Sequence, residues 1–217
     1  VENYDINLES VINNKTIEYR MGYYKSFYER DFLYKNSVDF LKEKGLDLVD
    51  IDAPEIRLEG FAKILDEDMR HDLRSYLFSY GNKNLKVDDI SSIIKYNELD
   101  SVERAPYGQG IFKKIIKDTM SINDFEDLKF ELMSNGNEFF NIPMDKFNLD
   151  VVLSINNYHA GYAAMAHNPC LTIPMKLRKN NEPAGLTIIG KSFEEQKLYE
   201  IGYFFERNFE GRVSPKN

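Results

Sequence analysis

The 217-residue sequence lacks several features that define particular classes of protein. Its single cysteine excludes a disulfide within the chain, which is typical of a reducing compartment. No apolar run approaches the roughly 18 residues that cross a membrane, and the N-terminus shows no basic segment followed by an apolar one, as a signal peptide would. We therefore expect a cytoplasmic protein with no membrane partner. Since the sequence begins with Val1 rather than methionine, we also expect a processed chain or a fragment.

Positive charge is scarce. The sequence has 28 Lys and Arg against 36 Asp and Glu, a formal net charge of −8, and the basic residues are scattered among the acidic ones. A nucleic-acid partner requires a basic surface that neutralises phosphates. The sequence therefore predicts no nucleic-acid binding.

Motifs that carry chemistry are also missing. The glycine pair Gly108–Gly110 is not followed by the Lys-Ser/Thr of a phosphate loop. His159 and His167 are eight residues apart but have no third ligand at metal spacing, so we expect no metal and no cofactor. Cys170 lies near both histidines, as in a cysteine–histidine dyad, but the apolar segment CLTIP predicts a buried, unreactive thiol.

Two carboxylate pairs invite comparison with acid–base catalysts. These are Glu67-Asp68 and Asp88-Asp89, and both are placed near helix starts or on polar helix faces. In such places capping and solvation are the ordinary roles of a carboxylate. We assign no catalytic residue from either pair.

The N-terminal part predicts a strand, a helix and a strand. Alternation over Ile17–Tyr23 indicates a strand with one buried face, residues 31–44 show helical spacing that ends at Gly45, and residues 46–52 form another strand. This order fits a parallel crossover. The following residues, about 55–145, are helical in pattern, and Asp124 is a candidate cap for the last of these helices.

The C-terminal part predicts a return to the sheet. Residues 150–155 form a strand, and the small-residue segment HAGYAAMAH forms a helix. Two strands, 171–173 ending at Pro174 and 186–189, form a hairpin, and Ser192 with Glu195 forms a capping box for a last helix. We predict an α/β fold with a mixed β-sheet, helices packed on it and a largely helical central insertion. The prediction is a single domain, 1–217, with sheet-forming ends at about 14–52 and 150–208.

The string HNPCLTIPMKLRKNNEPAGLTIIGKSFEEQKLYEIGYFFE resembles the C-terminal segment of the amidase signature family. The matching elements are a small-residue helix, a strand ending in Ile-Pro, the stretch P-x-G-L-x-x-I-G and a helix opening x-F-x-E-x-x-L. The segments MRHDLRSYL, ISSIIKYNE and APYGQG also resemble family patterns, closest to those of the peptide-amidase-like branch. The resemblance covers about residues 14 to 208 and implies the C-terminal half of an amidase-signature-type fold.

The resemblance implies a reaction whose catalytic residues are absent here. The family hydrolyses amides with a Ser–cis-Ser–Lys triad whose nucleophile lies in a segment resembling GGSSGGS. This sequence has no Gly-Gly pair, and its one Ser-Ser, Ser91-Ser92, lies in a helical stretch without glycine. No catalytic residue is carried over, and the chain alone is expected to be inactive.

The resemblance also indicates substrate-binding residues. The residues that follow strand 150–155, namely Asn156, Asn157, Tyr158 and His159, match the segment that lines the family's substrate cleft, although a polar turn explains the asparagines equally well. Members that draw ammonia from glutamine carry an Asp at about the position of Asn157. A neutral Asn lacks that charge-assisted bond, which favours an amidase over an amidotransferase.

Three hypotheses for function remain. The first is the C-terminal part of an amidohydrolase that supplies scaffold and pocket wall, with a small amide as the substrate of the complete enzyme. The second is a stand-alone, non-catalytic scaffold or binding protein, and the third is one chain of a split amidase. The expected partner is the missing N-terminal catalytic half or a second copy of the chain, because half of a continuous sheet leaves faces uncovered.

Overall fold

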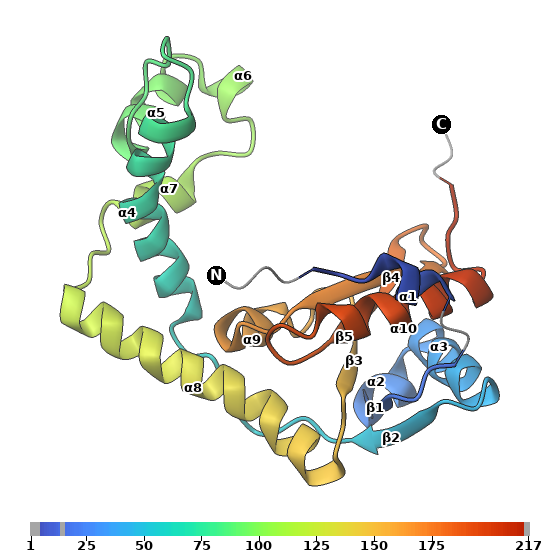
Figure 1. Cartoon of the computed structure of the whole chain (residues 1–217). Helices are drawn as coiled ribbons and strands as arrows, with labels where there is room; N and C mark the ends of the chain where they lie inside the picture. Colours follow the sequence, from blue (N-terminus) through green and yellow to red (C-terminus); the bar gives the residue numbers. More distant parts are fainter. Residues whose placement is uncertain (1–4, 14–15, 215–217) are drawn as a thin grey trace. The chain divides into compact units, whose positions relative to one another are not determined.

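The computed structural model of the chain describes residues 5–13 and 16–214, which form two compact units. Unit 1 combines the residues up to 58 with those from 133 onward, and unit 2 comprises residues 59–132. Helix α8 (Ile122–Phe147) begins in unit 2 and ends in unit 1 (Figure 1). The predicted helical region of about 55–145 contains the whole of unit 2, and the prediction of a single domain stays a prediction.

Within the described residues, unit 1 contains one five-stranded mixed sheet of order β2-β1-β3-β5-β4. β1 pairs in parallel with β2 and β3, whereas β5 runs antiparallel to β3 and β4. The predicted parallel crossover, mixed sheet and hairpin are therefore confirmed. The strands are β1 (Arg20–Tyr24), β2 (Asp47–Ile51), β3 (Val151–Ile155), β4 (Cys170–Leu177) and β5 (Pro183–Ile189).

Strand β4 continues through Pro174, so the prediction that this proline ends the strand is wrong. β4 is an edge strand, and an edge strand tolerates a residue without an N–H on its unpaired side. A shift in the register with β5 between Pro174 and Lys176 marks a bulge, and Lys176 has a φ of 106° there. The bulge absorbs the irregularity, and pairing resumes to Leu177.

Helices cover both faces of the sheet at its centre. Helices α3 (Phe32–Glu43) and α10 (Glu195–Asn208) pack on one face, and α9 (Ala160–Ala166) with the C-terminal part of α8 packs on the other. In β1, Met21 contacts the first layer and Tyr24 the second. The prediction that β1 buries only one face is therefore wrong, because a central strand of a parallel arrangement is enclosed on both sides.

The ends of α3 follow the predicted pattern. The Asp31 side chain accepts a hydrogen bond from the backbone N–H of Tyr34 at 2.9 Å, which satisfies one of the free donors at the helix start. After the helix, Gly45 has a φ of 82°, a conformation that glycine adopts without steric strain. Both features fix where the chain turns toward β2.

Two predicted helix caps are wrong. The Ser192 hydroxyl donates to the backbone oxygen of His167 at 2.8 Å rather than capping α10, which begins at Glu195 without a side-chain cap. At the start of α8, Ser121 Oγ accepts from the backbone N–H of Asp124 at 3.1 Å, so Ser121 is the capping residue. Asp124 lies inside the first turn of α8, where its carboxylate accepts a hydrogen bond from Ser121 Oγ at 2.7 Å.

Two short helices complete unit 1, α1 (Leu8–Asn13) and α2 (Lys25–Arg30). Glu200 of α10 is buried, and its carboxylate accepts hydrogen bonds from Tyr19 at 2.7 Å, Gln196 at 2.7 Å and Ser10 of α1 at 3.1 Å. A buried carboxylate is stable only with several such donors. The contact with Ser10 holds α1 against α10.

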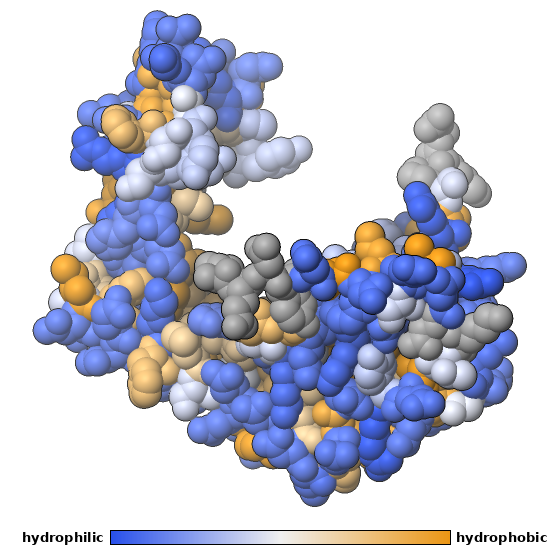
Figure 2. Space-filling model, in the orientation of Figure 1, coloured by the Kyte–Doolittle hydropathy of each residue, from blue (hydrophilic) through white to orange (hydrophobic). Residues whose placement is uncertain are grey.

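Unit 2 consists of α4 (Phe61–Tyr80), α5 (Ile90–Glu98), α6 (Ser101–Arg104), α7 (Gly110–Ile115) and the start of α8. Its small apolar core contains Ile90, Ile94 and Ile115. Figure 2 shows hydrophobic residues (orange) between the hydrophilic ones on the surface of this unit. Asp89 caps α5 as predicted, through the N–H of Ser92 at 2.7 Å. Glu67, predicted to be solvated, is instead buried.

Candidate functional site

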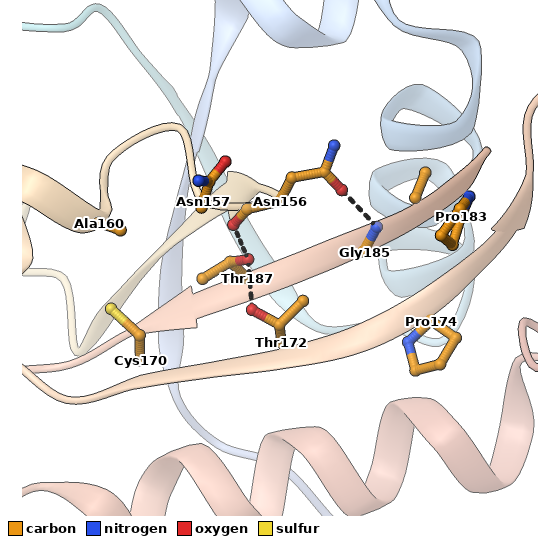
Figure 3. Close-up of a pocket in the computed structure, with 10 residues that line it drawn as sticks. Asn156, Asn157, Ala160, Cys170, Thr172, Pro174, Pro183, Gly185 and Thr187 are labelled. Carbon is orange, nitrogen blue, oxygen red and sulfur yellow. Dashed lines mark hydrogen bonds between the residues drawn. The ribbon is translucent and has the colours of Figure 1, made fainter. Parts of the chain in front are cut away.

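A cavity of about 500 Å³ lies on the β4–β5 hairpin. Helix α9 covers one face of the sheet over β1 and β3 but leaves the same face open at the β4–β5 hairpin. The cavity lies there, and its floor is formed by the alternate hairpin residues that point to this face. The turn between β3 and α9 forms one wall (Figure 3). The lining residues are Asn156, Asn157, Ala160, Cys170, Thr172, Pro174, Pro183, Ala184, Gly185 and Thr187.

Asn156 is anchored at the end of β3. Its backbone N–H donates to the backbone oxygen of Gly185 at 2.8 Å, and its side-chain oxygen accepts from the N–H of Gly185 at 2.8 Å. Its φ of 48° is left-handed, a conformation that asparagine tolerates better than most residues. Because the side-chain oxygen is engaged, the amide nitrogen, which points away from the hairpin (Figure 3), is the group available to a ligand.

A short hydrogen-bond relay connects the hairpin to Asn156. The Thr187 hydroxyl donates to the backbone oxygen of Asn156 and lies 2.8 Å from the Thr172 hydroxyl. A hydroxyl has one proton to donate, so Thr172 is the donor to Thr187, and the Thr172 oxygen keeps lone pairs that can accept a hydrogen bond. Gly185 permits this packing, because a Cβ there would lie 2.4 Å from Cγ2 of Thr172.

Asn157 and Tyr158 follow in the exposed turn. Asn157 lines the 500 Å³ cavity and also a second one of about 330 Å³, which Tyr158 lines too. No side chain within the described residues hydrogen-bonds the Asn157 carboxamide, so its donor and acceptor are both free. Tyr158 packs edge-on against Phe27, with ring centroids 4.9 Å apart. The structure therefore brings three predicted site residues, Asn156, Asn157 and Tyr158, to adjoining cavities.

His159 has a different environment. Its side chain is buried, its Nδ1 lies 2.8 Å from the Ser154 hydroxyl, and its ring lies between those of Tyr24, Phe139 and Phe27. Burial lowers the pKa of the imidazole to about 4, because an apolar environment disfavours the charged form. His159 is therefore neutral at pH 7 and lines neither cavity, and its predicted substrate contact stays a prediction.

Cys170 is exposed, so the prediction of a buried thiol is wrong. In β4 it shares a sheet face with Thr172 and Pro174, whereas Ile173 and Met175 point into the core. Neighbouring protein atoms still remove part of the solvent around the sulfur, which raises the pKa of the thiol. A raised pKa lowers the thiolate fraction at pH 7 and with it the nucleophilicity of the sulfur.

The groups that line the cavity can form hydrogen bonds but are poorly suited to acid–base chemistry. Its polar groups are the Asn156 amide nitrogen, the free Asn157 carboxamide and the Thr172 oxygen, and among its lining residues the Cys170 thiol alone titrates. Ser91 and Ser92 lie in α5, where Ser92 Oγ accepts from the backbone N–H groups of Asp88 and Asp89.

Within the described residues, neither a metal cluster nor a membrane-spanning helix is found. No cluster of three His, Cys, Asp or Glu residues there could hold a metal ion. None of the helices described has both the length and the apolar character to cross a membrane.

Sequence reasoning missed part of this site. It did not identify Thr172, Thr187, Gly185 or Ala160 as lining residues, although the alternation along β4 and β5 places the threonines and the glycine on one face. That alternation was the available signal, because Cys170, Thr172 and Pro174 are polar or small while Leu171 and Ile173 are large and apolar.

The curated relatives of the chain are components of an amidotransferase. The chain is 50% identical over 44 residues, 20% of its length, to the A subunit of glutamyl-tRNA(Gln) amidotransferase from Limosilactobacillus reuteri, covering 9% of that protein. It is 23% identical over 210 residues to the corresponding protein of Rhizobium etli, in a match that covers 82% of the chain and 41% of the relative. No protein family model matches the chain.

Solved structures of amidases share the fold. An amidase family protein from Bacillus anthracis matches 100% of the chain with a TM-score of 0.82 at 24% identity, and the peptide amidase of Stenotrophomonas maltophilia matches 91% with a TM-score of 0.76 at 18% identity. A bacterial aryl acylamidase of the amidase signature family matches 92% with a TM-score of 0.60 at 13% identity. The chain spans less than half of each, 46%, 44% and 45%.

Proposed function

We propose that this chain, which has the fold of the amidase signature family, is the C-terminal part of an amidohydrolase that cleaves small amides. In this proposal the chain supplies the scaffold and one wall of the substrate cavity, and the remaining part of the enzyme supplies the Ser–cis-Ser–Lys triad. Support comes from the share of the neighbours that the chain covers, 46% of the Bacillus anthracis protein.

The observation that carries the proposal is that Asn156 and Asn157, each with an amide group free for a ligand, line one cavity on the sheet face left uncovered at the hairpin. A primary amide has two donors and one acceptor, and a carboxamide side chain matches this pattern. The apolar lining from Ala160, Pro174 and Ala184 suits the hydrocarbon part of such a substrate. These groups bind and orient an amide but supply no nucleophile, which agrees with a wall rather than a complete active site.

The missing part of the enzyme is the partner that we propose for the uncovered face. The hairpin residues Cys170, Thr172 and Pro174 point to that face and are exposed in this chain. In a complete amidase fold, another segment would cover them and bring the nucleophile to the cavity. A split enzyme and a single longer chain satisfy this geometry equally well.

A second candidate activity has its own support. The curated relatives are subunits of glutamyl-tRNA(Gln) amidotransferase, so the complete protein is a candidate for amidotransferase chemistry. The neutral Asn157 argues against it, since an Asp at about this position binds the amino group of glutamine in members that use it. Comparing glutamine with glutaramate, which lacks only the amino group, as substrates of the complete protein separates the two activities.

Titration of the chain with butyramide tests the pocket wall directly. We expect the backbone NMR signals of Asn156, Asn157 and Gly185 to shift, and Asn157→Ala to weaken binding about fivefold to tenfold. Asn141→Ala is the matched control, because Asn141 is an exposed asparagine on α8 in unit 1. Equal affinity of both variants for butyramide, or NMR shifts confined to other residues, would refute the proposed amide-binding wall.

The coding sequence that precedes the codon of Val1 provides an independent test. An in-frame segment rich in glycine and serine, resembling the family signature, would support a single longer amidase. A separate gene that encodes such a segment would support the split enzyme. The lack of either would favour a stand-alone binding protein.

A further inference from the structure

The second cavity adjoins the first and has a different chemical character. Both cavities are lined by Asn156 and Asn157, but the second, of about 330 Å³, is also lined by two arginines, Arg30 and Arg178. Arg30 ends helix α2, and Arg178 lies just after β4. Two segments distant in sequence thus bring guanidinium groups to one cavity beside the amide-binding wall.

Arg178 is held in place by a neighbouring carboxylate. Its Nη1 lies 2.6 Å from Oδ2 of Asp31, while Oδ1 of Asp31 accepts the hydrogen bond from the N–H of Tyr34. Both carboxylate oxygens are therefore occupied. Asp31 therefore holds the Arg178 side chain, and it makes no ion pair with Arg30 among the described residues.

Arg30 is the unpaired charge of this cavity. Its side chain is exposed, and in the described ranges 5–13 and 16–214 no carboxylate lies within salt-bridge distance of its guanidinium. The cavity thus combines two guanidinium groups with one carboxylate that is already engaged. Its net charge is positive in a chain whose net charge is −8.

Aromatic rings form the rest of the wall. Phe27 and Tyr158 pack at 82° to each other and line the cavity with Ile155. Apolar groups beside a cation lower the local dielectric constant and strengthen its attraction for an anion. The planar guanidinium fork matches the two oxygens of a carboxylate better than a single point charge does.

We propose that this second cavity binds a carboxylate group, with Arg30 as its main partner and Asn157 donating a further hydrogen bond. Given the proposed function, a carboxylate in this cavity also defines the substrate class. The complete enzyme acts on amides that carry a free carboxylate a few atoms from the scissile bond, because Asn157 borders both cavities.

Binding of succinamate to the 217-residue chain tests this inference. Succinamate carries one amide and one carboxylate, and succinamide replaces the carboxylate with a second, neutral amide. We expect succinamate to bind about tenfold more tightly than succinamide, as a charge-assisted contact predicts. It should shift the backbone NMR signals of Tyr158 and Arg178 as well as those of Asn156.

Two charge variants separate a specific contact from general electrostatics. Arg30→Gln is expected to remove the preference for succinamate, whereas Lys25→Gln, which removes the same charge from the exposed start of α2, is expected to keep it. Equal affinity of the two ligands for the unchanged chain would overturn the inference, as would equal losses in both variants. Inorganic phosphate binding as tightly as succinamate would show an unselective anion site and would also overturn it.

The butyramide titration keeps the two proposals distinguishable. Butyramide has no charge and reports on the amide-binding wall alone. If butyramide shifts the signals of Asn156 and Gly185 while succinamate gains nothing over succinamide, the carboxylate site is refuted and the proposed function stands. If succinamate binds through Arg30 and butyramide does not bind, the carboxylate site stands and the proposed amide wall is refuted.

Discussion

Gly136 is the residue at which a single methyl group most directly tests the packing behind the candidate site. It lies in α8 within unit 1, and a Cβ at this position would lie 2.8 Å from the backbone oxygen of Tyr162 and 2.9 Å from the backbone nitrogen of Ala166. Both atoms belong to α9. Since backbone atoms cannot rotate away as side chains do, α8 and α9 must separate to accept the methyl group.

Gly136→Ala should therefore destabilise unit 1 in spite of alanine's better helix propensity. Alanine gains about 1 kcal/mol in a helix interior, while overpacking costs about 1–3 kcal/mol and more where backbone must move. We expect a net loss of about 2 kcal/mol in the free energy of unfolding. The matched control is Gly110→Ala in α7, where no atom lies within 4 Å of the added Cβ, and which should be neutral or slightly stabilising.

Urea-induced unfolding measures both variants, by the NMR signals of β3 and α9 for Gly136→Ala and by those of α7 for Gly110→Ala. The same spectra report the site, because α9 continues from the turn that carries Asn157. We expect Gly136→Ala to shift the signals of Asn157 and Ala160 in the folded chain. A Gly136→Ala variant as stable as the unchanged chain would refute the close approach of the two helices.

Three further predictions concern the site itself. Asn156→Ala should lower the free energy of unfolding by about 2 kcal/mol, because it loses the hydrogen bond to Gly185 and strains the left-handed backbone. Asn156→Gly should lower it by about 1 kcal/mol, because it loses only the hydrogen bond. Equal losses in urea titrations would contradict this. Burial lowers the pKa of His159 from 6.5 to about 4, so the unfolded chain binds a proton that the folded chain does not, and stability should fall by at most about 3 kcal/mol as the pH decreases from 6.5 to 4. His159→Asn should flatten that dependence and His167→Gln should not. Cys170 should react slowly with iodoacetamide in the folded chain at pH 7. Because the pKa of the thiol is raised from its ordinary value of 9.0, the reaction rate should keep rising above pH 9.0. A thiol that reacts only in urea would show that Cys170 is buried.

The strands were predictable because their patterns are local. Alternating residues, glycines and prolines marked every strand of the sheet, although β1 begins at Arg20 rather than at Ile17 and β4 and β5 are longer than predicted. The extension of β4 through Pro174 was not predictable, because it depends on β4 being an edge strand. The position of a strand in the sheet is a property of the whole fold and not of its own residues.

The helix starts show the same limit. Ser192 has the spacing of a capping box, but its hydroxyl donates a hydrogen bond to the carbonyl oxygen of His167, 25 residues earlier in the chain. Glu67 was placed on a polar helix face, yet it is buried and accepts hydrogen bonds from Arg70 and from the backbone N–H of Met120. Partners distant in sequence decide such cases, and no local pattern reveals them.

The candidate site was predicted in part. The turn after β3 was identified through a family resemblance, and it places Asn156, Asn157 and Tyr158 at the two cavities. The burial of His159 depends on rings from α2 and α8, which the sequence alone did not bring together. The arginines of the second cavity were missed for the same reason, since Arg30 and Arg178 are 148 positions apart.

Hydrolysis of an aryl amide by the purified 217-residue chain tests the central claim, that the chain provides a binding wall without the catalytic groups. The assay follows release of the aryl amine by absorbance, with buffer alone as the reference. We expect no release above the reference at any pH between 6 and 9, because the cavity contains no group able to act as general base for a nucleophile. Turnover that is abolished by replacing one residue of this chain, such as Cys170→Ala, would contradict the account.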